Sequence, residues 1–396
     1  MDDRDRAALA TEVLALGRAA GLDAVGIAAG EPFVGTRQII EERKAAGLHG
    51  GMQFTYRQPA RSTDPSATVP GAAALVVGAR RYLRADPVPD AADRITGSSP
   101  PAPGGRPLGT VARYSWSDHY LPLREALGAM ADHLVARGWR ARTVADDNAL
   151  VDREAAYRAG LGWYGKNANL LIPGRGSWFV LGAVITDAPL PAAEAPAPDG
   201  CGSCRRCLPA CPTGALVAPG VLDARRCLAW LVQAPGIFPA EHRVALGARI
   251  YGCDDCQEVC PVNERGARSE PPAPRDASDE ATVDLLELLA GDDDALLARH
   301  RRWYIAERAP RHLRRNALLA LGNVADGRDP AVVQAVERAL RDGDGLVRAH
   351  AVWAAARLGR TDLLDALRGD PDPDVQVELA RAAEVPTSDV AGTPGR

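Results

Sequence analysis

The stretches CGSCRRCLPACP (residues 201–212) and YGCDDCQEVCP (residues 251–261) hold seven of the eight cysteines of this 396-residue chain. The eighth, Cys227, lies between them. The first stretch has the spacing Cys-x2-Cys-x2-Cys-x3-Cys-Pro, which bacterial ferredoxins use to bind [4Fe–4S] clusters. Three close thiolates hold one cluster, and the fourth binds the other. Eight thiolates complete two such clusters, so the sequence predicts a domain that carries both.

The crossed ferredoxin arrangement divides the cysteines into two sets. The first predicted set is Cys201, Cys204, Cys207 and Cys260. The second predicted set is Cys211, Cys227, Cys253 and Cys256. The spacing also permits single exchanges between the sets.

Two other cysteine chemistries compete with this interpretation. Cys-x2-Cys is a zinc-ligand spacing as well, and closely spaced cysteines can form a disulfide framework. Zinc ribbons use two Cys-x2-Cys pairs and do not need the longer run that ends in Cys211-Pro212. Disulfide scaffolds are typically short and secreted, which this chain is not. Iron–sulfur clusters are therefore the favoured interpretation.

Charge and hydropathy narrow the class of protein. The 47 basic and 51 acidic residues give a net charge of −4, which does not point to nucleic acid. Residues 1–6 are rich in aspartate and lead into an amphipathic pattern, not into a signal peptide. No segment reaches the roughly 18 apolar residues of a membrane span. We expect a soluble, cytoplasmic protein in which the thiols stay reduced.

Helices and strands alternate before the cysteines, which predicts an α/β core. Apolar spacing predicts helices at Asp5–Ala20, His119–Arg137 and Asp152–Gly160, and strands at Ala24–Ala28, Ala73–Ala79, Trp139–Ala145 and Ser177–Thr186. Residues 85–108 and 188–199 are rich in proline and are predicted as a surface loop and a linker.

The C-terminal part shows a different periodicity. RRNALLA (314–320) aligns with RAHAVWA (348–354) at a spacing of 34 residues, and Asp372 begins a third partial copy. Such repetition is typical of HEAT-like helix pairs, although an ordinary helical bundle is the alternative. The predicted domains are 1–190 (mixed α/β), 191–270 (ferredoxin-like, two clusters), 271–385 (α-helical HEAT-like repeats) and 386–396 (a disordered tail).

Several motifs in a fixed order make the resemblance to a known family specific. They are VADDNALVDREAAYRAGLGWYGKN (144–167), GSWFVLGAVITD (176–187), the two cysteine stretches, LDARRCLAWL (222–231) and RRNALLALGN (314–323). In this order the chain resembles the epoxyqueuosine reductase family. The resemblance covers most of residues 10–325. It implies a cobalamin-dependent oxidoreductase, with the cobalamin in residues 1–190, that reduces epoxyqueuosine to queuosine at the wobble position of tRNA.

The family's catalytic aspartate falls on Asp146 when the motif is counted back from Ala159 and Gly160. Here Asp147 and Asn148 follow it, whereas the commoner family pattern has small residues and proline. Asp147 is therefore the reserve candidate. The implied role is to protonate the departing epoxide oxygen, which requires a pKa raised by burial or by a neighbouring acid.

The resemblance also implies contacts with cofactor and substrate. Arg57, Tyr114, Asp146 and Asn167 are the candidates for lining the corrin pocket, and the absence of a DxHxxG motif implies base-off cobalamin. An external low-potential electron donor is required, and we expect a monomer. The tRNA backbone would be bound by Arg299, Arg301, Arg302, Arg308, Arg311, Arg314 and Arg315.

Two other functions fit part of the sequence. A reductive dehalogenase-like enzyme that acts on a small molecule would use the same cofactors but has no need of the C-terminal repeats. A non-catalytic iron–sulfur electron-transfer protein would leave Asp146 and the AGLGWYGKN stretch (159–167) without a role.

Overall fold

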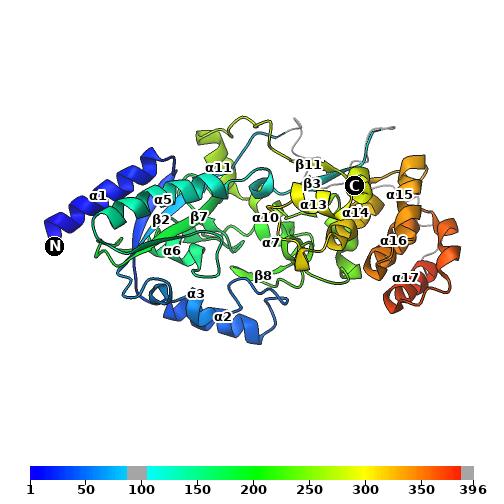
Figure 1. Cartoon of the computed structure of the whole chain (residues 1–396), viewed down its shortest axis with the longest axis horizontal. Coiled ribbons are helices and arrows are strands. Elements are labelled where there is room, and N and C mark those ends of the chain that lie inside the picture. Colours follow the sequence, from blue (N-terminus) through cyan, green and yellow to red (C-terminus); the bar gives the residue numbers. More distant parts are fainter. Residues whose placement is uncertain (87–104, 385–396) are drawn as a thin grey trace. The chain divides into compact units, whose positions relative to one another are not determined.

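The computed structural model describes residues 1–86 and 105–384 (Figure 1). The predicted tail at 386–396 and most of the predicted loop at 85–108 lie outside the described residues. The chain forms two compact units, each built from separate stretches. Unit 1 comprises Met1–Ala85, Ser117–Cys227 and Asp254–Ala277, and unit 2 comprises Asp86–Trp116, Leu228–Cys253 and Ser278–Arg396.

Unit 1 is built on a four-stranded sheet with the order β1-β2-β7-β4. Its strands are β1 (Ala24–Ala29), β2 (Ala74–Arg81), β7 (Phe179–Thr186) and β4 (Ala141–Val144). All three strand pairs are antiparallel, with β2 and β7 in register from Ala74↔Thr186 to Arg81↔Phe179. The two central strands are rich in valine and alanine and almost entirely buried, as expected for strands covered on both faces.

Helices cover both faces of this sheet (Figure 1). One face carries α1 (Asp3–Ala19) and α5 (Tyr120–Ala136), and the other carries α6 (Asp152–Arg158). The side of β2 at Gly78 faces Leu127 of α5. The side chains of Leu75 and Val77 belong to the buried apolar cluster that includes residues of α6. This two-residue alternation is what places apolar side chains on both sides of one strand.

Shorter elements complete unit 1 around the cysteine stretches. They are α2 (Val34–Ala45), α3 (Pro59–Ser62), η1 (Pro65–Ala67), β5 (Trp163–Tyr164), β6 (Leu170–Leu171), α7 (Cys207–Ala210), β8 (Leu216–Ala218), β9 (Val221–Leu222), α10 (Asp255–Glu258) and α11 (Pro261–Ser269). The hairpin β5-β6 carries the end of the AGLGWYGKN stretch. Pro261 follows Cys260 at the start of α11, where the ring costs no helical hydrogen bond.

Unit 2 combines a small sheet with helical repeats. The sheet has the order β10-β3-β11, from β10 (Arg249–Tyr251), β3 (Leu108–Val111) and β11 (Thr282–Asp284). The helical elements are η2 (Arg113–Ser115), α8 (Leu228–Leu231), η3 (Ala240–His242), α9 (Arg243–Leu246), α12 (Leu285–Ala290), α13 (Asp293–Arg299), η4 (Ala306–Arg308), α14 (Arg311–Val324), α15 (Pro330–Leu340), α16 (Gly345–Arg357), η5 (Thr361–Leu367) and α17 (Pro373–Glu384).

Aspartates start the helices of unit 2. The side chains of Asp284, Asp292, Asp329 and Asp344 each accept a hydrogen bond from a backbone N–H of the first helical turn. Such caps satisfy donors that have no partner inside the helix. The Asp-rich turns of the predicted repeats are therefore helix caps.

The predicted helices and strands are confirmed, within one to three residues at most ends. The mixed α/β, cluster-bearing and HEAT-like fold class is also confirmed. α14 and α16 pack together, as do α16 and α17, which is the neighbour-only packing of a solenoid. No helix among the described residues is both long and apolar enough to cross a membrane.

Candidate functional site

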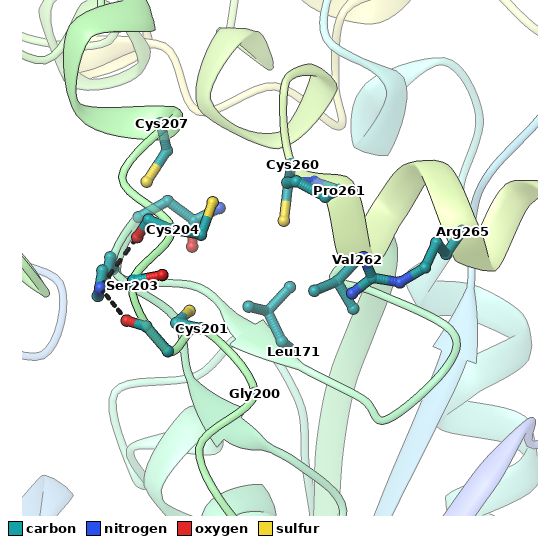
Figure 2. Close-up of a pocket in the computed structure, with 13 residues that line it drawn as sticks. Leu171, Gly200, Cys201, Ser203, Cys204, Cys207, Cys260, Pro261, Val262 and Arg265 are labelled. Atoms are coloured by element: carbon teal, nitrogen blue, oxygen red, sulfur yellow. Dashed lines mark hydrogen bonds between the residues drawn. The ribbon is translucent and has the colours of Figure 1, made fainter.

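The four cysteines of the first predicted set line one cavity of about 340 Å³ in unit 1. Cys201, Cys204 and Cys207 come from the loop that leads into α7, and Cys260 immediately precedes α11. Figure 2 shows their thiol groups arranged around a common space, with Leu171 and Val262 beside them. No carboxylate side chain lines the cavity. The thiols and their apolar surroundings fit a cluster held by thiolates.

A single zinc ion and a disulfide framework are the alternatives to a cluster at these cysteines. Thiolates lie about 2.3 Å from zinc and would close tightly on one ion. Among the described residues, no group of three or more His, Cys, Asp or Glu side chains is arranged to hold a single metal ion. All eight cysteines are free, and none forms a disulfide. Four thiols around one cavity match the four thiolates that hold a [4Fe–4S] cluster.

The turn at Lys166 and Asn167 ties the first cysteine run to the second. The Lys166 ammonium donates to the carbonyls of Gly202 at 2.5 Å and Cys204 at 2.9 Å. The side-chain amide of Asn167 donates to the carbonyl of Cys256 at 3.2 Å. Two adjacent residues thus hold backbone segments that are some 50 residues apart in the sequence. This contact positions the loops that present the thiols.

Three cysteines of the second predicted set also lie in unit 1. Burial raises the pKa of Cys256, and the neighbouring thiols of Cys227 and Cys211 raise it further. The backbone N–H of Ala215 donates to the Cys211 sulfur at 3.2 Å, the type of contact that tunes a cluster's reduction potential. Cys253 belongs to unit 2, where it packs against a buried cluster that includes Phe238.

Asp146 lies in the loop between β4 and α6. Its φ of 53° is in the left-handed region, which is uncommon for residues other than glycine. The Asp147 carboxylate accepts a hydrogen bond from the backbone N–H of Ala149 at 2.8 Å, which closes a tight turn. The two acids therefore differ in what they do. The Asp147 carboxylate holds the backbone turn, whereas the Asp146 carboxylate accepts no hydrogen bond within the described residues.

The surroundings of Asp146 favour its protonated form. The residue is exposed, yet enough protein surrounds its carboxyl group that desolvation raises its pKa. The charge of Arg124 opposes this shift, and that of Asp147 adds to it. A carboxyl group that is reachable from solvent but poorly hydrated suits a proton donor.

Asp152 and Tyr120 complete an acidic cluster that sequence reasoning missed. Burial raises the pKa of Asp152 well above its usual range, and the charge of Asp146 adds to this effect. Its buried Oδ1 has no hydrogen-bond partner among the described residues. Burial also raises the pKa of Tyr120, and both carboxylates add to the shift. The spacing of Asp146 and Asp152 was visible in the sequence, but their proximity depends on the β4–α6 turn.

The remaining cofactor candidates lie in different surroundings. Arg57 is exposed, and its guanidinium makes no recorded hydrogen bond or ion pair within the described residues. Asn167 is buried. Its side-chain oxygen accepts a hydrogen bond from the backbone N–H of Asn169, and its side-chain nitrogen donates one to the carbonyl of Cys256. Tyr114 lies in unit 2, where its ring packs 6.2 Å from that of Tyr251. Their predicted contacts with a corrin ring remain predictions.

The predicted arginine surface is partly wrong. Arg315 is only 1% exposed and donates to the carbonyls of Leu231, Val232, Ala234 and Gly236 and to the side chain of Asn316. It holds the segment after α8 in place and is not available to a phosphate. Its basic neighbours Arg311 and Arg314 made this buried cation look like part of an exposed basic face in the sequence.

Other arginines of that segment are paired with acids. Arg299 bonds Glu280, Arg311 bonds Glu307, and Arg314 bonds Asp293. Arg301, Arg302 and Arg308 are exposed, and of their side chains only that of Arg302 hydrogen-bonds within the described residues, to the carbonyl of Trp116. The surface open to a polyanion is therefore smaller than the sequence suggested.

Two family models match the chain. One describes a 4Fe–4S double cluster binding domain and matches residues 200–263. The other describes HEAT repeats and matches residues 300–384. Together they confirm the two-cluster domain and the C-terminal repeats that the sequence predicted.

Known proteins resemble the chain over most of its length. An epoxyqueuosine reductase from Xanthomonas campestris is 34% identical, covering 88% of this chain and 96% of that protein. One from Bacillus cereus is 30% identical, covering 95% and 97%. A crystal structure of an epoxyqueuosine reductase with an epoxyqueuosine-modified tRNA-Tyr stem loop has a TM-score of 0.81 and 29% identity, covering 94% of this chain and 97% of that one. A structure of an epoxyqueuosine reductase from Bacillus subtilis has its catalytic aspartate loop swung out of the active site. It is 30% identical to this chain, with a TM-score of 0.81, and the match covers 94% of this chain and 98% of that one.

Proposed function

Since this chain belongs to the epoxyqueuosine reductase family, we propose that it reduces epoxyqueuosine to queuosine in tRNA. The observation that carries the proposal is the joint presence in unit 1 of a four-thiol cavity and an acidic cluster around Asp146. Removal of an epoxide oxygen to leave an alkene consumes two electrons and two protons. The cavity fits a source of electrons, and the acidic cluster fits a source of protons.

Cysteine thiolates would hold the two [4Fe–4S] clusters in the sets given above. The clusters would deliver electrons from an external low-potential donor, and base-off cobalamin, when bound, would supply the reactive metal centre. Lys166 and Asn167 hold the cysteine loops in place. Arg57 and Tyr114 remain the candidates for contacts with the corrin ring, with Asn167 acting mainly through the cysteine loop.

Asp146 would donate a proton to the departing oxygen. Desolvation holds its proton at a pH where an ordinary aspartate is ionised, and solvent access lets the proton be replaced after each turnover. The charge of an ionised Asp146 would in turn raise the pKa of the buried Asp152 carboxyl and of the Tyr120 hydroxyl. The like charge that favours protonated Asp146, besides its burial, is that of Asp147.

The tRNA would be bound through exposed guanidinium groups of unit 2. Arg301, Arg302 and Arg308 are the members of the predicted set that are exposed, and Tyr304 between them is 53% exposed. Guanidinium groups bind backbone phosphates, and an exposed aromatic ring can stack on an unpaired base. Because tRNA modification takes place where tRNA is used, we infer a cytoplasmic location.

One experiment separates this function from its alternatives. The chain is purified and reconstituted without oxygen, given cobalamin and a reductant, and incubated with an epoxyqueuosine-bearing stem loop. Its nucleosides are then analysed by mass. We expect queuosine from the wild type and from Asp147→Asn, and a loss of activity of about 10²-fold or more for Asp146→Asn.

Each contrary result has a definite meaning. Retained activity in Asp146→Asn with loss in Asp147→Asn would transfer the donor role to Asp147. Absence of queuosine together with cobalamin binding would favour a small-molecule reductase. A protein that contains clusters but binds no corrinoid would favour an electron carrier, and zinc in place of iron and sulfide would refute the cluster assignment.

A further inference from the structure

Two segments far apart in the sequence both contain a residue with unusual backbone geometry. Thr55 has a φ of 63° and Asp146 a φ of 53°. Left-handed geometry is especially unusual for a β-branched residue such as threonine. Such residues persist only when surrounding contacts hold them, and they cluster at functional sites. The contacts that hold these two residues are therefore informative.

A side-chain hydrogen bond connects the two segments. The side-chain oxygen of Asn148 accepts from the backbone N–H of Thr55 at 2.9 Å, across 93 positions of sequence. A second link lies four residues beyond Asp147, where the backbone N–H of Val151 donates to the carbonyl of Ser62 at 3.0 Å. The Ser62 hydroxyl in turn donates to the carbonyl of Thr55 at 3.3 Å. The loop that carries Asp146 is thus attached at two points to residues 55–62.

The two attachments differ in character. The Val151 bond joins two backbone groups at the start of α6, so it does not depend on which side chains are present. The Asn148 bond depends on one side chain and lies two residues from Asp146.

We propose that Asn148 is a positioning residue for Asp146, because its side chain ties the Asp146 loop (146–151) to the Thr55 loop (51–57). The tie holds Asp146 in its left-handed conformation. Breaking it leaves the Asp146 loop attached to residues 55–62 only through the Val151 backbone bond, so the part around Asp146 moves more freely. The role in catalysis rests on the proposed function of Asp146, whereas the tie itself is a property of the fold.

The test compares Asn148→Leu, which has a similar size but no acceptor, with Asn148→Asp, which keeps an acceptor oxygen. Gln53→Leu is the matched control, since Gln53 lies in the Thr55 loop but bonds only within it, to the carbonyl of Gly51. All variants are made in the full-length, cluster-loaded protein. Asn148 is exposed, so folding is retained and is checked by circular dichroism.

The first readout is hydrogen exchange at the Thr55 amide, resolved by fragmentation mass spectrometry. Loss of one typical hydrogen bond corresponds to exchange about fivefold faster in Asn148→Leu. Asn148→Asp and Gln53→Leu should retain the wild-type rate. Unchanged exchange in Asn148→Leu, or equal acceleration in Gln53→Leu, would overturn the tie.

The second readout is kinetic and uses the modified stem loop. We expect Asn148→Leu to lower kcat by about fivefold with KM within twofold of the wild type, because proton donation matters in the reaction and not in binding. Asn148→Asp should restore kcat and move its pH profile upward, since an added carboxylate favours protonated Asp146. A change confined to KM would overturn the positioning role. Full activity in Asp146→Asn would refute the proton donor and leave the exchange result as an independent test of the tie.

Discussion

A buried ion pair in unit 2 allows a quantitative prediction about stability. The Arg243 guanidinium donates to both carboxylate oxygens of Glu378, at 2.6 and 2.9 Å, and the two side chains are 0% and 3% exposed. Arg243 also donates to the carbonyl of Phe238 at 3.0 Å. Through this pair α17, the last described helix, is attached to α9. We therefore expect the pair to control how firmly the final repeat is held.

Removal of one partner should be costly. Glu378→Leu leaves the Arg243 charge buried without a counter-ion, which typically destabilises a protein by about 3–5 kcal/mol. The retained bond to Phe238 places the expected loss in the free energy of unfolding near the lower limit, about 3 kcal/mol, or roughly a hundredfold in the unfolding equilibrium. The double variant Arg243→Met with Glu378→Leu removes both charges and should recover most of that loss, to within about 1 kcal/mol of the wild type.

Urea unfolding monitored by tryptophan fluorescence measures both effects. The Arg243 guanidinium carbon lies 6.0 Å from the centre of the Trp353 ring, so this ring reports on the pair, and a Trp353→Phe background identifies its signal. Arg381→Ala serves as the control, because it removes an outer, half-exposed partner of Glu378 and leaves the Arg243 contact intact. The reasoning fails if Glu378→Leu loses less than about 1 kcal/mol, or if the double variant is no more stable than the single one.

Three further predictions concern charge. The charge of Arg124 lowers the pKa of Asp146, and that of Asp147 raises it. The decrease of kcat at high pH should therefore move to higher pH in Arg124→Leu and to lower pH in Asp147→Asn. Identical pH profiles in both variants and the wild type would contradict the assigned donor. Burial holds the pKa of His350 well below that of an unfolded histidine, so protons bind preferentially to the unfolded chain. At pH values below about 6.5, the free energy of unfolding should therefore decrease by up to about 1.4 kcal/mol per pH unit. Denaturant titrations at pH 7.5 and 5.5 measure this decrease, and His350→Gln should lose it. The Lys166 charge lies beside the first cysteine run, so its loss should make a cluster bound there harder to reduce. In a redox titration followed by electron paramagnetic resonance, Lys166→Met should move the midpoint potential of that cluster to a more negative value, whereas Lys166→Arg should not. Equal shifts in both variants would indicate a purely structural role.

Local patterns predicted a large part of this protein. The cysteine spacing predicted two clusters, and the two-residue and 3.6-residue periodicities predicted the central strands and the flanking helices of unit 1. A 34-residue repeat predicted the helices around Arg315. These features depend on residues close together in the chain, so they can be recognised without knowing which segments meet.

Contacts between distant segments could not be predicted in this way. Arg315 has the sequence surroundings of an exposed basic helix, but it lies against the carbonyls that follow α8 and is buried by them. Asn148 meets Thr55 only because the β4–α6 loop comes beside residues 51–57. The charge of Asp146 raises the pKa of the buried Asp152 carboxyl because the intervening turn brings the two acids together.

The sequence by itself determined which chemical groups this protein carries and which local structures present them, because thiolate spacing and apolar periodicity act over a few residues. Only the tertiary structure decided which of those groups share an environment. The pKa of Asp146, the burial of Arg315 and the bond from Thr55 to Asn148 all depend on the dielectric and hydrogen-bonding surroundings that packing creates.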